Sequence, residues 1–180
     1  MDRLLDDLEW NDSFDNVRAR TIIILFYEAG LRRSELMGLN DGDVDFVGGQ
    51  LKVTGKRNKQ RIIPFGEELA DELHHYITVR DAQFGRAAGE ALFLNDKGER
   101  ISDYQVYGIV RKYLSAVTSL KKRSPHVLRH TFATAMLNNG AGLEEIKNLL
   151  GHESVSTTEI YTHTTFEQLK RVYKEAHPRA

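Results

Sequence analysis

The stretch LLGHESVSTTEIYTH, residues 149–163, organises our interpretation of the whole chain. It predicts a helix that ends at Gly151, a loop rich in Ser and Thr, and a second helical turn that carries Tyr161. One imidazole, His152, precedes this loop. Because the pKa of a tyrosine hydroxyl is about 10, chemistry at Tyr161 would need help from side chains elsewhere in the chain.

Length and composition indicate one globular domain with a substantial core, since 41% of the 180 residues are hydrophobic. The sequence has no transmembrane or signal-peptide character, and we expect a cytoplasmic protein that does not bind membranes. It contains no cysteine, which excludes disulfides and Cys-based zinc or redox centres. We predict neither a metal nor a cofactor.

Charge is unevenly distributed, although the net charge is only −1. Residues 1–15 are acidic, whereas residues 52–61 hold five bases and no acid, and residues 104–143 hold bases and no acid. Such basic segments can bind phosphate even in a neutral chain. Solvated faces of an ordinary protein remain the alternative.

Hydrophobic periodicity and turn residues predict a mainly helical α+β fold with a small three-stranded antiparallel sheet. A further short strand is expected at residues 91–94. The expected helices cover residues 3–10, 16–29, 31–37, 67–83, 102–117, 125–138, 143–150 and 166–176. The expected strands of the sheet cover residues 43–46, 50–54 and 61–65.

Two candidate sites lie in the first third of the chain. Arg32 and Glu35 are three residues apart and share a helix face, so the carboxylate could hold the guanidinium in place. A surface ion pair would have the same spacing. The turn at residues 55–60 is crowded with cations that repel one another, which favours an anion beside Lys56. A merely solubilising turn is the alternative.

Another candidate site begins a helix at Pro125, where His126 and Arg129 share a face close to the N-terminus. His126 and His130 also have the spacing of a His-Glu-x-x-His zinc site. Val127 stands where that motif needs its glutamate, which argues against zinc hydrolysis. Together these cations, imidazoles and Tyr161 suit phosphoryl transfer without a metal.

The motifs resemble those of the tyrosine recombinases, or phage-type integrases, in the same order along the chain. The matching segments are Gly30-Leu31-Arg32-x-Ser34-Glu35-Leu36, Gly55-Lys56, His126-x-x-Arg129-His130, Leu150-Gly151-His152 and Ile160-Tyr161-Thr162-His163. The resemblance covers about residues 16–173 and is greatest to the Xer type, although integrases of mobile elements are similar. It implies the tyrosine recombinase catalytic-domain fold and site-specific DNA recombination, in chromosome-dimer resolution or in integration and excision.

This resemblance implies a role for each candidate. Tyr161 would attack the scissile phosphate and form a 3′-phosphotyrosyl link, while Arg32 and Arg129 would hold the non-bridging oxygens. Lys56 would protonate the departing 5′ oxygen.

The remaining candidates would assist these groups. His126 would help remove the tyrosine proton or hold the phosphate, His152 would donate to a phosphate oxygen, and Glu35 would support the arginine site. The predicted DNA contacts are Arg57, Lys59, Arg61, Lys121, Lys122 and Arg123.

The resemblance also sets expectations for domains and partners. Residues 1–15 would be an acidic lead-in and residues 16–180 the catalytic domain, without the family's N-terminal core-binding domain; we expect an excised catalytic domain. The partner would be a double-stranded recombination site, bound by a homo- or heterotetramer that exchanges the C-terminal helix, 166–176. The isolated domain could be a monomer, with this helix packed on its own core or on a neighbour.

Two rival functions stay open at this point. A type IB topoisomerase-like enzyme would share the tyrosine chemistry but only relax DNA. A non-catalytic DNA-binding relative would lack the chemistry, although every expected catalytic position is filled here.

Overall fold

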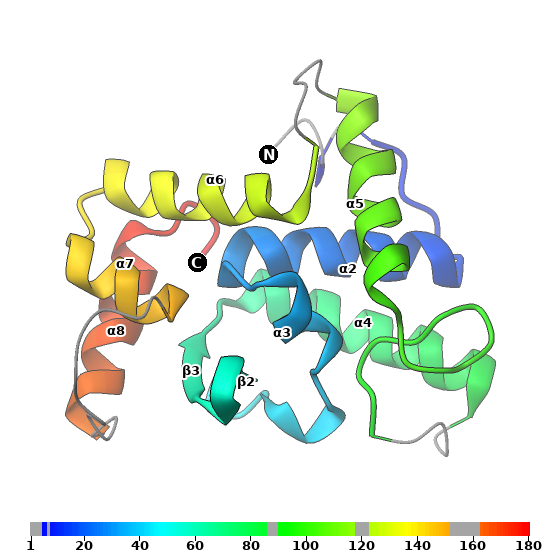
Figure 1. Ribbon diagram of the computed structural model, residues 1–180, viewed down its shortest axis with the longest axis horizontal. Helices are drawn as coiled ribbons and strands as arrows, with labels where there is room; N and C mark the ends of the chain where they lie inside the picture. Colours follow the sequence, from blue (N-terminus) through cyan, green and yellow to red (C-terminus); the bar gives the residue numbers. More distant parts are fainter. Residues whose placement is uncertain (1–4, 7, 86–89, 118–122, 152–162) are drawn as a thin grey trace.

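Helices make up most of the chain, with a small sheet at the lower edge of Figure 1. The structure is a computed structural model that describes residues 5–6, 8–85, 90–117, 123–151 and 163–180. The helices are α2 (Phe14–Ala29), α3 (Arg33–Met37), α4 (Glu67–Phe84), α5 (Asp103–Val117), α6 (Pro125–Asn138), α7 (Leu143–Leu150) and α8 (His163–Ala176), with 3₁₀ turns η1 (Asp41–Asp43) and η2 (Lys56–Asn58). The strands are β1 (Val44–Asp45), β2 (Gln50–Thr54) and β3 (Gln60–Pro64).

Helix α2 lies at the centre and packs on α4, α5 and α6 (Figure 1). Its residues 22–26 are all 0% exposed, because neighbours cover the helix on every side. Gly30 ends α2 with a left-handed φ of 59°. A Cβ there would lie 2.7 Å from Phe132 and 2.8 Å from Leu150, so the end of α2 meets α6 and α7 closely.

The sheet is antiparallel with strand order β1-β2-β3, which confirms the predicted mainly helical α+β fold. Leu51 pairs with Ile63 and Val53 with Arg61, and these alternate positions face the interior. Strand β2 contacts α3, and β3 contacts α7 and α8. The sheet therefore joins the first helices of the chain to the last ones.

The strand expected at residues 91–94 does not form. Ala91 and Leu94 make only isolated bridges to other segments. Part of the backbone between them bonds to buried side chains: the Tyr76 hydroxyl donates to the Leu92 carbonyl at 3.1 Å, and Arg80 donates to the same oxygen at 2.9 Å. The Leu92 N–H donates to the Leu39 carbonyl at 3.0 Å, and the Phe93 carbonyl accepts from the Ile101 N–H at 2.9 Å. Side chains of α4 and two separate backbone segments thus share the polar groups that neighbouring strands would have paired.

The C-terminal segment packs on its own core. Tyr173 of α8 is buried, and His177 stacks on it with ring centroids 5.0 Å apart. Arg179 pairs with Glu68 at 2.8 Å and with Asp6 at 3.0 Å. The end of the chain is thereby tied to α4 and to the acidic lead-in.

Candidate active site

Arg32 and Glu35 form the pair that the sequence predicts, but the carboxylate is buried. Arg32 is the N-cap of α3, and its Nη1 donates to Glu35 Oε1 at 2.8 Å. The backbone N–H of Arg32 donates to Oε2 at 2.7 Å. The Glu35 side chain is 1% exposed and that of Arg32 is 32% exposed, so this is not an ordinary surface ion pair. The arginine can be reached from solvent while its carboxylate cannot.

We expected Arg61 to contact DNA, but its side chain points into the protein and is only 6% exposed. Nη1 and Nη2 donate to the two oxygens of Glu35 at 2.6 and 2.9 Å, and Nε donates to the Leu149 carbonyl at 2.8 Å. Strand alternation places Arg61 on the same face as buried Ile63. That alternation is the sequence signal that could have identified it.

Glu35 is held as a carboxylate. Burial alone would raise its pKa, but the hydrogen bonds and charge of Arg61, followed by those of Arg32, outweigh burial and lower it. Each carboxylate oxygen accepts two hydrogen bonds. A buried charge with every acceptor position used can hold both arginines in one orientation.

Arg129 approaches the same place from α6. It is 8% exposed, its Nη1 donates to the Gly30 carbonyl, and its Nη2 donates to the Leu150 carbonyl at 2.8 Å. Burial, and then repulsion from Arg32, lower the pKa of Arg129 to about 10. Because neutral pH is well below that value, the guanidinium remains charged.

The end of α7 is the point on which the three arginines converge. Gly151 ends this helix in a left-handed conformation with φ 63°. Carbonyls at a helix C-terminus carry partial negative charge and attract cations. Three consecutive carbonyls each accept from a different guanidinium: Leu149 from Arg61, Leu150 from Arg129 and Gly151 from Arg32.

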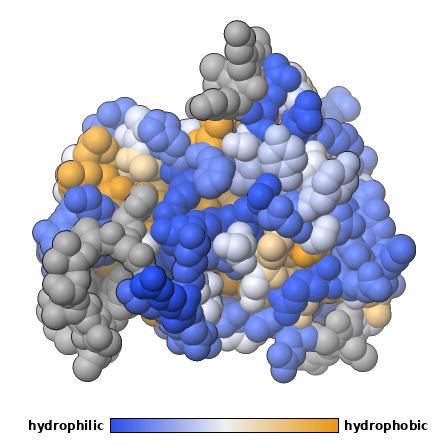
Figure 2. All heavy atoms as spheres, in the orientation of Figure 1, coloured by the Kyte–Doolittle hydropathy of each residue, from blue (hydrophilic) through white to orange (hydrophobic). Residues whose placement is uncertain are grey.

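The turn that carries Lys56 lies against this cluster. A Cβ on Gly55 would lie 3.2 Å from Glu35 Oε1, so the backbone before Lys56 passes close to the carboxylate. Lys56 is exposed in η2. Arg57 and Asn58 have φ values of 57° and 58°, a left-handed conformation that is costly outside glycine. Hydrophilic side chains cover this part of the face in Figure 2.

His126 lies on the first turn of α6, one turn before Arg129, with an exposed side chain. Arg123 is half-buried and donates to Ser115 at 3.1 Å. Of the other predicted site residues, Arg57 and Lys59 are exposed on the turn after β2. His152, Tyr161, Lys121 and Lys122 lie outside the described residues.

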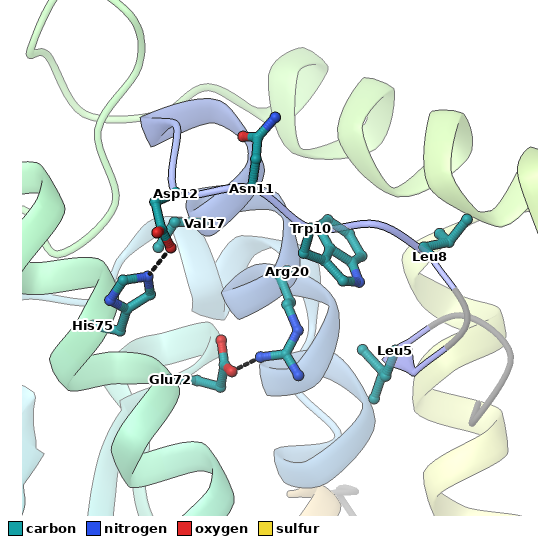
Figure 3. A pocket seen from close by; sticks show the side chains of 9 residues that line it. All are labelled: Leu5, Leu8, Trp10, Asn11, Asp12, Val17, Arg20, Glu72 and His75. Carbon is teal, nitrogen blue, oxygen red and sulfur yellow. Dashed lines mark hydrogen bonds and ion pairs between the residues drawn. The ribbon is translucent and has the colours of Figure 1, made fainter.

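A cavity of about 360 Å³ lies elsewhere, beside the first half of α2 (Figure 3). Arg20 pairs there with Glu72, and Asp12 with His75 at 3.2 Å. The arginine cluster is at the opposite end of α2, so this cavity is not part of it.

Within the described ranges, no three His, Asp or Glu side chains gather where a metal ion could bind. Nor does any helix in those ranges have the length and apolar character needed to cross a membrane.

Comparisons with known proteins identify the family of the chain. The sequence profile of the phage integrase family matches residues 1–168. Tyrosine recombinase XerC of Chlorobaculum tepidum is 48% identical over 172 residues, which cover 93% of this chain and 51% of that protein. The crystal structure of XerA recombinase matches with a TM-score of 0.74 and 31% identity, over 99% of this chain and 63% of that chain. XerH in its post-cleavage complex with a palindromic difH substrate matches with a TM-score of 0.73 and 25% identity, over 94% and 48% of the two chains.

The fold is that of a tyrosine recombinase catalytic domain. The chain belongs to the phage integrase family, with Xer recombinases among its similar relatives. It spans about half the length of the curated relatives it matches.

Proposed function

We propose that this chain carries out site-specific DNA recombination as the catalytic part of an Xer-type enzyme, by cleaving and rejoining strands without a metal ion or cofactor. The observation that carries the proposal is the convergence of Arg32 and Arg129 on the end of α7. This end immediately precedes His152, and Tyr161 follows nine residues later.

The charges at this place suit a phosphodiester. Three guanidiniums and only one carboxylate gather around the end of α7 in the described part of the chain, so Arg32 and Arg129 keep positive charge for an incoming phosphate. Each guanidinium has five N–H donors, and within the described residues the side chains of Arg32 and Arg129 each use two of them in protein contacts. The remaining donors can bind the two non-bridging oxygens, and they would stabilise the added charge of the transition state.

The proposed cleavage forms a bond between the Tyr161 oxygen and phosphorus and breaks the bond from phosphorus to the 5′ oxygen. The tyrosine proton passes to His126 or to water, and Lys56 gives a proton to the leaving 5′ oxygen. His152 donates to a non-bridging oxygen. One phosphoester replaces another, so the link conserves energy, and a second strand's 5′-hydroxyl can reverse the step.

The substrate would be a double-stranded recombination site in the cytoplasm. The similar XerH recombinase, which is bound to a difH substrate, supports a DNA site as the substrate. Arg57, Lys59, Lys121 and Lys122 would contact its backbone. We place the function in chromosome-dimer resolution rather than in mobile-element transfer, because identity to XerC reaches 48%. A tetramer would form on DNA through exchange of α8, which in the free chain packs on its own core.

Covalent capture tests the proposal. Duplexes with randomised half-sites and a nick beside the cleavage position lose their short 5′-hydroxyl fragment after attack, which traps the protein on DNA. Wild type is expected to give adducts that survive denaturation, and Tyr161→Phe none. Tyr104→Phe, which changes an exposed tyrosine at the start of α5, serves as the matched control and should retain them. Adducts with Tyr161→Phe, or none with wild type, would overturn the assignment.

A further inference from the structure

Arg61 is the most deeply buried of the three arginines around α7, with 6% of its side chain exposed. It makes a two-point contact with Glu35 and a third contact with the Leu149 carbonyl. A group so placed has no access to DNA. Its effect on the reaction must pass through the groups that it holds.

One such group is Arg32, which Arg61 reaches through Glu35. Oε1 of Glu35 accepts from Arg61 at 2.6 Å and from Arg32 at 2.8 Å, so one oxygen is shared between both guanidiniums. If Arg61 were absent, the carboxylate would neutralise Arg32 alone. With Arg61 present, the trio keeps a positive charge, and Glu35 can orient Arg32 without cancelling its attraction for a phosphate.

The other group is the end of α7. The Arg61 Nε contact caps a helix carbonyl two residues before Gly151. A Cβ on Gly151 would lie 3.0 Å from Arg61 Cδ and from Nη1, so the left-handed turn passes directly over the guanidinium. The position of Gly151, the residue before His152 in the sequence, therefore depends on the position of Arg61.

We propose that Arg61 is a positioning residue for the cleavage reaction, which sets the orientation and net charge of Arg32 and the position of the end of α7. This role rests on the proposed function of the site. In this role Arg61 stabilises the phosphate indirectly, through Arg32 and the end of α7, and does not bind DNA itself.

The test compares the rates of adduct formation by Arg61→Gln and by wild type. Both proteins are given two versions of one half-site that the covalent capture has identified. One has the normal scissile phosphate, and the other a methylphosphonate, in which a neutral methyl group replaces one charged oxygen. Loss of cationic stabilisation matters for the charged substrate far more than for the neutral one. We expect Arg61→Gln to slow adduct formation about 100-fold on phosphate, the typical effect of losing one preorganised donor, and clearly less on methylphosphonate. Arg32→Ala should give the same pattern.

Arg80→Gln is the matched control. Arg80 is also buried, makes a two-point contact with Asp41 at 2.6 and 3.0 Å, and caps the Leu92 carbonyl at 2.9 Å. Arg80→Gln should lower the unfolding free energy about as much as Arg61→Gln does. The ratio of its adduct-formation rates on phosphate and on methylphosphonate should stay as in wild type. This ratio does not depend on the folded fraction of a variant, since both substrates meet the same protein sample.

Arg61→Lys provides a second variant in case Arg61→Gln does not fold. It keeps the charge but not the two-point geometry, and should shift the ratio in the same direction by a smaller factor. Equal slowing of both substrates by the Arg61 variants, as in the control, would overturn the positioning role alone. Absence of any adduct with wild type would overturn the proposed function, and this role with it.

Discussion

Glu28 should make the protein less stable as the pH rises towards 8. This carboxyl group lies inside α2 and is 0% exposed. Its Oε2 accepts from the Tyr173 hydroxyl at 3.5 Å, and Oε1 has no hydrogen-bond partner within the described part of the chain. Burial, followed by the negative charge of Glu68, raises the pKa of Glu28 from 4.5 to about 8.

The direction and the size of the change in unfolding free energy follow from this pKa. Between pH 4.5 and about 8 the folded protein keeps a proton that the unfolded chain releases. Glu28 therefore contributes its full stabilisation below pH 4.5, and this is lost as the pH rises through the folded value. Each tenfold change in proton affinity is worth about 1.4 kcal/mol, so the whole loss is on the order of 5 kcal/mol.

Urea unfolding at several pH values between 6.5 and 8 measures the upper part of this loss, with Glu28→Gln as the variant. Lower pH values are left out because burial lowers the pKa of His177 from 6.5 to about 4, so that its effect on stability has the opposite sign there. Glutamine has nearly the same shape and no titration, so the variant should show a much shallower pH slope and exceed wild type in unfolding free energy at pH 8. Glu175→Gln removes an exposed carboxylate from α8 and is expected to leave the wild-type slope in place. If Glu28→Gln kept that slope, or if wild type were equally stable throughout the range, the reasoning about the buried carboxyl would be wrong.

Two further predictions follow. Gly30→Ala should lower the unfolding free energy by about 2–3 kcal/mol, because the φ of Gly30 is 59° and the new methyl would meet Phe132 and Leu150. Gly108→Ala, in open space on α5, should raise the unfolding free energy by about 0.5–1 kcal/mol. Thermal unfolding that ranked the two variants equally would contradict this prediction. Lys56→Ala should slow adduct formation about 100-fold or more on a normal substrate and much less where sulfur replaces the leaving 5′ oxygen, because a thiolate leaves without an acid. Equal slowing on both substrates in a gel assay would remove Lys56 from the role of proton donor.

Much of the fold could be predicted because its local signals are strong. Helix α7 has the predicted bounds, and α6 begins at Pro125 as expected. The strand predicted at residues 91–94 was wrong for a physical reason. Its apolar run is typical of a buried strand, but Tyr76 and Arg80 bond to part of its backbone, and the rest pairs with two separate segments. No local pattern in those residues records side chains that arrive from another helix.

Part of the contacts in the candidate site could be predicted from the sequence, and part could not. The spacing of Arg32 and Glu35 indicated their contact, which the structure contains at 2.8 Å. Arg61 looked like one more cation of a basic turn, yet it is buried against the same carboxylate. Its position in an alternating strand hinted at this, but a charged residue is assigned to the interior only when its partner is known.

By itself, the sequence determined the family and the main helices, because hydrophobic periodicity, caps and ordered motifs are properties of short segments. Only the tertiary structure decided that three arginines, distant in sequence, share the carbonyls at the end of α7, and that α8 packs on its own core. Those features depend on which buried charges and polar groups find partners. Such partners are set by the packing of the whole chain rather than by any one stretch of it.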